Sequence, residues 1–510
     1  MQVLDWYRKV DERYRITFIS TFIFGLIAHG MALFNKYSFH DDIGALFDMS
    51  GPINSGRWAL EALTLVQKAI HGPGIYSLPL LKGLLSIFFI ALTACLLVYF
   101  WDIESQFACI LFGGLMVSFP VITGLFAFVY TAPAYMFALW VGVLATIVIC
   151  HRPSVWKWLL SVFAISCSIG VYQAFIPFFL VVILVYFMQQ LLKSESTAEN
   201  SLKDMLYFLF SCIIYIGLYF LLTKFFLAVT DNVLSDYQGI SSMGFGTPGG
   251  EYLQRFCFAY REFFVPTADK SSYMFPGRII YFYWAAIILL VLFAVYYLRR
   301  AYQTSMAKGV LLTLCMALFP FAVDFIFFMV SPKHVHRLMV YAHVCVFLVL
   351  ILCFDHCRAI FEKKKAVNYF LIGMSCLLLF LYCRYDNICY FKTELAQQEA
   401  ISYFTTLVTQ IKSANGYDDD MPVVYINDMQ NKDSTMYEVG ENFPMMDSIA
   451  ELPAYANDYL WKDFVKYWCG FDPEEADEAD FIDLPEVRQM PSYPDDGSIK
   501  VINNTVVVKY

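Results

Sequence analysis

Long, almost uncharged apolar runs recur along this chain and limit the folds that it can adopt. About 20 helical residues cross the hydrocarbon core of a bilayer. Eleven runs reach or approach that length, at 16–34, 78–100, 107–126, 131–150, 158–170, 175–192, 205–228, 279–298, 310–330, 338–354 and 367–383. Only 15% of the residues are charged, against about 25% in soluble proteins. Because a membrane β-barrel shows short alternating segments instead, we expect an α-helical integral membrane protein with about 11 transmembrane helices.

Basic residues in the short loops predict the orientation of these helices. The stretch 158–192 decides the outcome, because it is either one tilted helix or a hairpin broken at GVYQAF, residues 170–175. As a hairpin it places most later basic residues, including Lys193, Lys308 and the lysines at 363–365, on the cytoplasmic side. As one helix it reverses that bias. We therefore expect the hairpin, a cytoplasmic N-terminus, and outside loops at 35–77 and 229–277.

The C-terminal quarter has a different character. Residues 384–510 contain 24 acidic residues against 9 basic ones, whereas the rest of the chain contains 20 and 26. A helical pattern at 393–412, a buried strand in MPVVYIND at 421–428, and two β-rich runs around Asn-Asn at 503–504 predict a small α/β domain. We expect a membrane domain at 1–383 and an acidic domain at 384–510 outside the cytoplasm. No concentrated basic patch suggests nucleic-acid binding.

The first outside loop carries the residues that most suggest chemistry. Asp41 and Asp42 follow the first apolar run by seven and eight residues, near the level of the lipid head groups. They are either the N-cap of a short helix, IGALFDMS, or functional carboxylates. Further along, Ser55 can cap a helix that begins at Gly56.

The segment that follows predicts an amphipathic helix at the membrane surface. Its apolar side includes Trp58, Val66 and Ile70, and its polar stripe consists of Arg57, Glu61, Thr64 and Lys68. An interfacial linker explains this pattern as well as a binding site does.

Other polar residues occur where a helix bundle could gather them. The turn SPKHVHRLMV holds four cationic candidates, which suit a phosphate group or ordinary contacts with lipid head groups: Lys333, His334, His336 and Arg337. Asp324 lies about 10 Å below the end of its span, at ~1.5 Å per residue. A carboxylate at that depth predicts a functional group or a partner for a basic residue. Gln173 lies in the break of the hairpin, and Lys82 lies one turn inside the second span.

Several chemistries find no support in the sequence. The chain contains no Walker A loop, HExxH, GxSxG or dinucleotide fingerprint, which argues against a soluble nucleotide donor. An enzyme that works outside the cytoplasm would take a lipid-carried donor through a groove between helices. The 14 cysteines show no metal-ligand spacing, and only Cys389 and Cys469, in the tail, leave a disulfide open. We expect no metal and no cofactor.

Four stretches together resemble the serotype-converting O-antigen glucosyltransferases, the glucosyltransferase II family. They are SFHDDIG at 38–44, SGRWALEAL at 55–63, LPLLKGLLSIFFIALTA at 78–94 and SIGVYQAFIP at 168–177. The resemblance implies a multispanning glycosyltransferase of the bacterial inner membrane that uses polyprenyl-phosphate sugars. Its donor would be a hexose, glucose, on undecaprenyl phosphate. Its acceptor would be a sugar of a lipid-linked O-antigen, reached on the periplasmic side, where the acidic domain would also lie.

The resemblance also implies roles for residues. An acidic residue of the first outside loop is the base in this wider class, and Asp41 and Asp42 occupy that place. Transfer needs a base for the acceptor hydroxyl and cations for the leaving phosphate. A single base implies inversion at the anomeric carbon, and which aspartate acts stays open. We assign phosphate binding to Arg57, Arg337, His336 and Lys82, and substrate binding to Glu61, Gln173 and Asp324.

Two other classes of function stay open. An O-antigen polymerase, or another polyprenyl-linked sugar transferase, would have a similar architecture, although polymerases carry arginine-rich outside loops. A lipid-sugar flippase or transporter would show repeat symmetry and charged residues along several spans. The role of the acidic tail is also open, between recognising the acceptor, gating a cavity and covering it.

Overall fold

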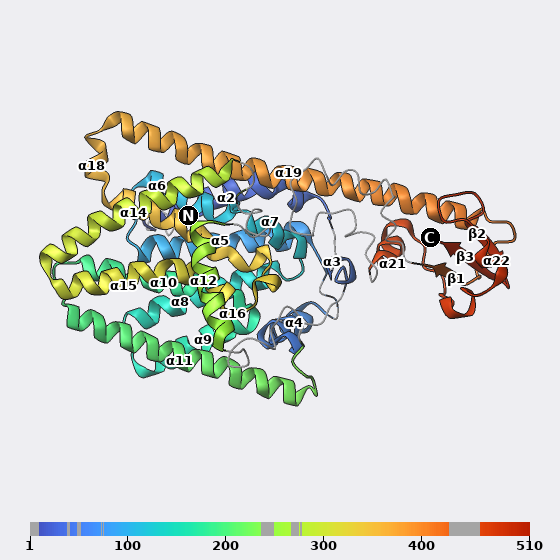
Figure 1. The fold of residues 1–510 in the computed structure, drawn as a ribbon, viewed down its shortest axis with the longest axis horizontal. Coiled ribbons are helices and arrows are strands. Elements are labelled where there is room, and N and C mark those ends of the chain that lie inside the picture. Colours follow the sequence, from blue (N-terminus) through green and yellow to red (C-terminus); the bar gives the residue numbers. More distant parts are fainter. Residues whose placement is uncertain are drawn as a thin grey trace, which may run out of the picture. The chain divides into compact units, whose positions relative to one another are not determined.

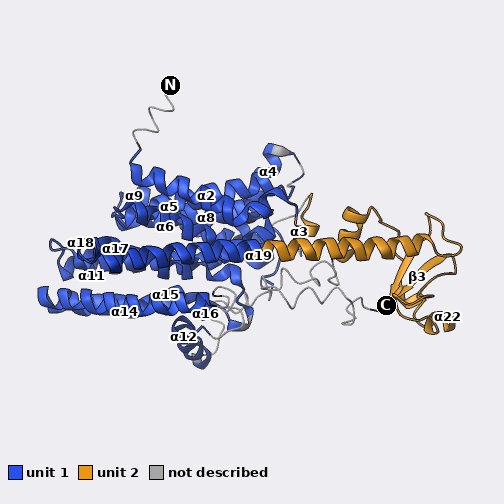
Figure 2. Cartoon of the chain, turned by 90° about the horizontal axis from the view of Figure 1, so that it is seen from above, with its two compact units in different colours: residues 1–36, 48–387 blue, residues 37–47, 388–510 orange. Residues whose placement is uncertain are grey.

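Helices dominate the computed structural model, which describes residues 10–37, 41–47, 53–72, 74, 76–235, 249–266, 275, 278–427 and 460–510. The chain divides into two compact units (Figure 2). The first comprises Met1–Lys36 and Asp48–Asn387, and the second comprises Tyr37–Phe47 and Ile388–Tyr510. Within the predicted outside loop at 229–277, the structure describes residues 229–235, 249–266 and 275.

The first unit is a bundle of apolar helices (Figure 1). Its long helices are α2 (Glu12–Phe34), α5 (Pro79–Phe100), α6 (Gln106–Ser118), α8 (Ala132–Cys150), α9 (Val155–Val171), α10 (Ile176–Leu192), α11 (Ala198–Val229), α14 (Ile279–Thr304), α15 (Met306–Val323) and α17 (Val344–His356). Shorter or amphipathic helices connect them: α4 (Trp58–His71), α7 (Val121–Leu125), α12 (Gly249–Phe264), α16 (Phe325–Met329) and α18 (Arg358–Glu362). The helix α19 (Lys365–Lys412) begins in this unit and ends in the second.

The helices are compatible with a membrane protein. Among the described residues, nine helices are long and apolar enough to cross a bilayer, or ten if α6 and the segment Val121–Phe128, bent by 42°, form one span. The helix α9 is apolar but has only 17 residues. The structure therefore supports a helical membrane protein, and the count of eleven spans stays a prediction.

The hairpin predicted at GVYQAF is confirmed. At the break, Tyr172 has an extended backbone, and its ring stacks on Tyr135 at the start of α8, with centroids 4.5 Å apart. Near the end of α10, Tyr186 donates to the carbonyl of Cys150 at the end of α8. The chain therefore leaves Cys150, runs along α9 to the level of Tyr135, and returns along α10. We call these levels of the bundle the Cys150 end and the Tyr135 end.

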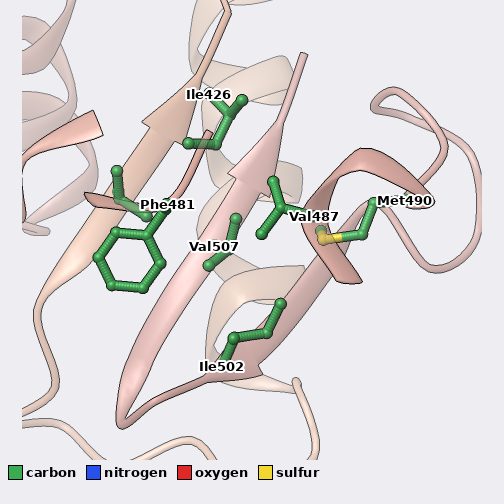
Figure 3. Close-up of a cluster of buried hydrophobic side chains, with 7 residues drawn as sticks. Ile426, Phe481, Val487, Met490, Ile502 and Val507 are labelled. Atoms are coloured by element: carbon green, nitrogen blue, oxygen red, sulfur yellow. The ribbon is translucent and has the colours of Figure 1, made fainter. Parts of the chain in front are cut away.

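The second unit contains a three-stranded sheet in the order β1–β3–β2. The strand β1 (Val423–Ile426) runs parallel to β3 (Thr505–Lys509), and β2 (Ile499–Ile502) runs antiparallel to it. The predicted hairpin between β2 and β3 is confirmed, with positive φ at Asn503 and Asn504, as tight hairpin turns require. The apolar core beneath the sheet consists of Val424, Ile426, Phe481, Val487, Met490, Ile502 and Val507 (Figure 3).

Helical elements complete the second unit. They are α3 (Asp41–Gly44), α21 (Trp461–Phe464) with the π-helical turn Val465–Cys469, and α22 (Pro485–Arg488). The span expected at 367–383 and the helix expected at 393–412 are one continuous helix, α19, because no proline separates them. Cys389 is buried and Cys469 lies 3.9 Å from Thr405 Oγ1, so both keep their thiols.

Candidate active site

The two candidate carboxylates begin a short helix. Asp41 and Asp42 occupy the first turn of α3, where the helix dipole favours negative charge. The helix therefore includes the two aspartates. The N-cap alternative instead predicts a helix that begins after them, at Ile43. Asp42 is fully buried, whereas Asp41 is partly exposed. Of the two residues, Asp41 is therefore the one with surface left exposed.

The aspartates belong to the same compact unit as the acidic tail. A Cβ at Gly44 would lie 3.3 Å from Leu460 Cδ2 and 4.0 Å from Asp463 Oδ2, so α3 packs closely on α21. Tyr37, just before α3, donates to Glu394 of α19 at 3.5 Å. The tail therefore holds the segment that carries the candidate base. The sequence leaves open three roles for the tail, which are recognising the acceptor, gating a cavity and covering it. Holding this segment is a further, structural role.

Arg57 is held between two tyrosines of the first unit. Its Nη1 donates to Tyr135 Oη at 3.1 Å, and its Cζ lies 5.4 Å from the ring centroid of Tyr172. The two tyrosine rings are nearly parallel, with an interplanar angle of 10°. A guanidinium fixed on aromatic rings keeps its charge and has a defined orientation, which recognition of a phosphate requires.

The turn before Arg57 depends on a close backbone approach. Gly56 has φ +71°, and a Cβ there would lie 2.7 Å from Tyr219 Oη and 3.1 Å from Gln173 Nε2. Gln173 Nε2 donates to the carbonyl of Ser55 and to Tyr219 Oη, both at 3.0 Å. In this structure the amide of Gln173 therefore positions the turn that presents the arginine.

The prediction that Ser55 caps a helix beginning at Gly56 is wrong. The helix α4 begins at Trp58, with Arg57 at its N-cap, and Ser55 ends a separate 3₁₀ turn, Ile53–Ser55. The positive φ of Gly56 interrupts the helix, because the right-handed helix requires negative φ.

The helix α4 turns its polar stripe toward the protein. Thr64 is buried and Glu61 is partly buried, whereas the opposite side exposes Leu65, Val66 and Ile70. Trp58 anchors the start of the helix by stacking on Phe226, with centroids 5.2 Å apart. An apolar face outward and a polar face inward suit an interfacial helix over a polar site more than a plain linker.

Lys82 and Arg57 both contact residues at the start of α8. Its side chain is 9% exposed, and its Nζ donates to the carbonyl of Tyr130 at 3.2 Å. Tyr130 comes two residues before α8, and Tyr135, the partner of Arg57, lies in the first turn of α8. The structure therefore brings two of the predicted phosphate ligands to one helix N-terminus, whose partial positive charge also favours an anion.

Arg337 is more deeply buried than a surface clamp would be. It opens the 3₁₀ helix Arg337–His343 and is 1% exposed. Its Nη2 donates to Tyr385 Oη at 2.9 Å, and its charge acts on the buried carboxylate of Asp386. Asp386 accepts from Thr123 Oγ1 at 2.6 Å. These contacts also fix α19 against the bundle.

A small cavity is lined by residues that neighbour Arg57 and by residues that follow Arg337. Tyr135 and Tyr172, which hold Arg57, line it from one side. Leu338 and Tyr341, on the 3₁₀ helix that Arg337 opens, line it from another. His336 directly precedes that helix and is partly exposed. Arg57, Lys82, Arg337 and His336 thus lie at the Tyr135 end of one unit, and Asp41 and Asp42 lie in the other.

Asp324 pairs with a histidine inside the bundle. Its Oδ1 lies 2.5 Å from His343 Nε2, and both side chains are fully buried. Asp324 separates α15 from α16, and His343 ends the 3₁₀ helix that begins at Arg337. The structure favours the alternative in which this carboxylate fixes the bundle through a basic partner.

A larger groove runs among α10, α14, α15 and α17 in the first unit. The empty space in it is about 890 Å³, including the part that is open to the surroundings. Its lining is apolar and includes Val185, Ile287, Phe319 and Leu352. An apolar groove between membrane helices suits a hydrocarbon chain.

Some residues of the site carry no recognisable signal in the sequence. Tyr135 and Tyr219 are two of 35 tyrosines, and only the fold brings them to Arg57 and Gly56. The helix α12 carries two buried charges, Arg255 and Glu262, in a region expected to be an outside loop. Among the described residues, no group of three or more histidines, cysteines or carboxylates is placed to hold a metal ion.

Comparison with known proteins tests the resemblance seen in the sequence. The family model described as glucosyl transferase GtrII matches residues 30–354, which is well over half of the chain. No curated protein and no solved structure matches the chain. The matched range contains both candidate aspartates, Arg57 and Arg337, and ends before α19. The resemblance is confirmed, and the chain belongs to the glucosyl transferase GtrII family.

Proposed function

We propose that this protein transfers glucose from undecaprenyl phosphate to a sugar hydroxyl of O-antigen or lipopolysaccharide, on the periplasmic side of the bacterial inner membrane. Membership of the family supports glucosyl transfer, and the apolar helices support a membrane enzyme. The observation that carries the lipid-phosphate donor is the guanidinium of Arg57, held by Tyr135 and Tyr172 at the start of α8.

The sidedness of the reaction follows from the ends of the bundle. At the Cys150 end, Lys308 donates to the carbonyl of Lys193, and Arg152 pairs with Asp204. Basic loops of this kind favour the cytoplasm, so the Tyr135 end faces the periplasm. Nucleotide sugars are absent there, and a lipid must therefore supply the sugar.

Asp41 acts as the general base in this proposal. The acceptor hydroxyl gives its proton to Asp41 while its oxygen bonds to C1 of the glucose, and the bond from C1 to the phosphate oxygen breaks. A single displacement attacks the face opposite the leaving group, so the anomeric configuration inverts. Asp42, which is buried in α3, orients the helix that presents Asp41.

Cations stabilise the polyprenyl phosphate that leaves. Negative charge develops on its oxygens, and preorganised donors lower the barrier most where charge develops. Arg57 and Lys82 supply this charge at the start of α8, and Arg337 and His336 supply it from the segment that leads into Leu338. In this proposal Glu61, one turn along α4 from Arg57, accepts hydrogen bonds from sugar hydroxyls.

The groove among α10, α14, α15 and α17 accommodates the isoprenoid chain of the donor. Its apolar lining offers burial for a hydrocarbon, which contributes about 0.8 kcal/mol per buried methylene. Burial of the lipid chain in the groove provides binding energy for the donor. The cations that bind its phosphate then position the donor for reaction.

A transfer assay with radiolabelled glucose tests this proposal. Membranes that contain the protein should move label from undecaprenyl phosphate to lipopolysaccharide and should invert the anomeric carbon. Arg57→Ala should lower kcat by about 10²–10³-fold, because a donor to the developing charge is lost. Arg57→Lys should restore only part of the rate, because an ammonium lacks the planar fork of a guanidinium.

A matched arginine provides the control for this assay. Arg152→Ala removes a half-exposed arginine at the Cys150 end, where it pairs with Asp204, and should leave transfer unchanged. Transfer of glucose by the purified protein directly from UDP-glucose would contradict the lipid donor. A product with retained anomeric configuration would contradict the single base.

A further inference from the structure

Two aromatic side chains from distant parts of the sequence meet on the surface of the second unit. Phe47 follows α3, and Tyr467 lies in the π-helical turn after α21. Their ring centroids are 5.1 Å apart, in an edge-to-face arrangement of 68°. Phe47 is 50% exposed and Tyr467 is 40% exposed. Adjacent exposed rings form an apolar patch, and such patches mark binding surfaces more often than single exposed residues do.

The turn that carries Tyr467 rests on a packed base. Trp461 stacks on Phe404 of α19 with centroids 5.8 Å apart, and Phe464 lies 5.6 Å from the same ring. Trp468 stacks on Phe464 at 4.8 Å. Because these contacts already order the turn, little conformational freedom is left to lose when a ligand binds to Tyr467.

The aromatic pair belongs to the same compact unit as the candidate base. Phe47 lies six residues after Asp41, at the end of the segment that docks on the second unit. Between them, Gly44 packs against Leu460 and Asp463 at the start of α21. The base, the ring of Phe47 and the ring of Tyr467 therefore belong to one compact substructure.

We propose that Phe47 and Tyr467 form the platform that binds a pyranose ring of the acceptor glycan beside Asp41; this inference rests on the function proposed above. The C–H bonds of a pyranose face carry partial positive charge and stack on aromatic rings. Sugar hydroxyls donate hydrogen bonds to carboxylates, and Asp463 lies in α21, which leads into the turn. Asp472, just after the turn, pairs with Lys466 at 2.7 Å and has a second carboxylate oxygen that can accept from a hydroxyl.

The charge of the unit favours a sugar over a lipid surface. Residues 384–510 carry 24 acidic residues against 9 basic ones. The anionic head groups of a bacterial membrane repel such a unit, and juxtamembrane anchors are rich in lysine and arginine instead. A neutral glycan meets no such repulsion, and the exposed rings bind it through its apolar face.

Acceptor kinetics of the full-length enzyme in detergent test the platform. Two acceptors are used: intact lipopolysaccharide, and the soluble polysaccharide that mild acid releases from it. Tyr467→Ala should raise KM for both acceptors about three- to tenfold, the range for the loss of an aromatic contact, and leave KM for the donor unchanged. Tyr467→Phe keeps the ring and should keep KM for the acceptor. Phe47→Ala should reproduce the defect from the other side of the pair.

The controls separate the possible outcomes. Ile482→Ala removes another exposed apolar side chain of the same unit and should leave both KM values unchanged. An unchanged donor KM shows that Tyr467→Ala is folded. If Tyr467→Ala is unstable, Phe47→Ala tests the platform in its place. A defect with lipopolysaccharide that disappears with the soluble glycan would assign the pair to membrane contact and overturn the inference. An active wild type with unchanged acceptor KM in both alanine variants would overturn the platform alone, whereas an inactive wild type would overturn the proposed function.

Discussion

At the scale of single residues, Gly56 sets the direction of the candidate phosphate-binding arginine. Its positive φ interrupts the chain just before α4, and Gln173 and Tyr219 close around the turn. Arg57 then meets Tyr135 and Tyr172. The arginine is therefore preorganised by contacts between four separate segments of the first unit.

A matched pair of glycines tests this close approach. Gly56 and Gly72 both have positive φ, but a Cβ at Gly72 would meet no atom within 4 Å, whereas one at Gly56 would lie 2.7 Å from Tyr219 Oη. Both alanine variants should lose about 1–3 kcal/mol, because positive φ strains the backbone of alanine at both positions. Gly56→Ala should lose a further 1–3 kcal/mol, about the cost of overpacking, and most of its glucosyl transfer. Thermal unfolding in detergent measures the first effect and the transfer assay the second. Equal losses in the two variants would show that the turn tolerates a side chain.

The sequence predicted some of these residues and could not predict others. Arg57 and Gln173 stand out because polar groups are costly beside a membrane and must be satisfied. The tyrosines around them do not stand out, because a tyrosine at the end of a membrane helix is ordinary. Asp386 follows the last predicted span and was assigned to the tail, yet it is buried beside Thr123. Contacts between distant segments carry no local pattern.

At the scale of elements, broken helices build the Tyr135 end of the bundle. The chain breaks between α9 and α10 at Tyr172, and between α15 and α16 at Asp324. The sequence predicts the first break, because a hairpin at residues 158–192 places most later basic residues on the cytoplasmic side. It does not predict the second, because the apolar run continues through it. At that break the structure places the buried pair of Asp324 and His343.

A double-mutant cycle tests whether this pair fixes the elements that it joins. Asp324→Ala or His343→Ala alone should destabilise the bundle by about 3–5 kcal/mol, because each leaves a buried polar partner uncompensated. The double variant should cost less than the sum of the two. Unfolding in mixed micelles with increasing dodecyl sulfate gives these free energies.

A surface pair supplies the control for the cycle. Glu199 and Lys203 face each other on α11 at 2.6 Å, with side chains 76% and 60% exposed. Glu199→Ala should change the free energy of unfolding by no more than about 0.5 kcal/mol. Additive effects of Asp324→Ala and His343→Ala would show that the two residues act separately.

At the scale of the whole molecule, the candidate groups are divided between two units. The cations lie in the helical bundle, and the aspartates lie in a segment that packs with the tail. The sequence predicted a boundary near residue 383, close to the observed one after Asn387, because the composition changes there. It could not predict that residues 37–47 join the tail, because a short segment in one loop gives no sign of a partner 350 residues away.

The orientation of the chain is testable with matched cysteines. Ser413 directly follows α19 in the second unit, and Ser194 lies two residues after α10 at the Cys150 end; both are exposed. In intact spheroplasts, a membrane-impermeant maleimide should label Ser413→Cys above the background of the native cysteines. It should label Ser194→Cys only after the membrane is permeabilised. The reverse pattern would place the tail in the cytoplasm and remove the reason for a lipid-carried donor.

The division of roles between the two aspartates is the centre of the proposed mechanism. Asp41 is partly exposed and Asp42 is fully buried at the start of one helix, and we therefore propose Asp41 for proton abstraction and Asp42 for support of the helix. General-base catalysis contributes about 10²–10⁴-fold to a rate.

The most direct measurement of the proposed mechanism is the rate at which three variants transfer labelled glucose from undecaprenyl phosphate. They are Asp41→Asn, Asp42→Asn and, as a control on the exposed tail, Asp420→Asn. We predict that Asp41→Asn inserts normally and loses at least about 10²-fold in rate, that Asp42→Asn loses less, and that Asp420→Asn is unchanged. Near-normal transfer by Asp41→Asn would contradict the mechanism.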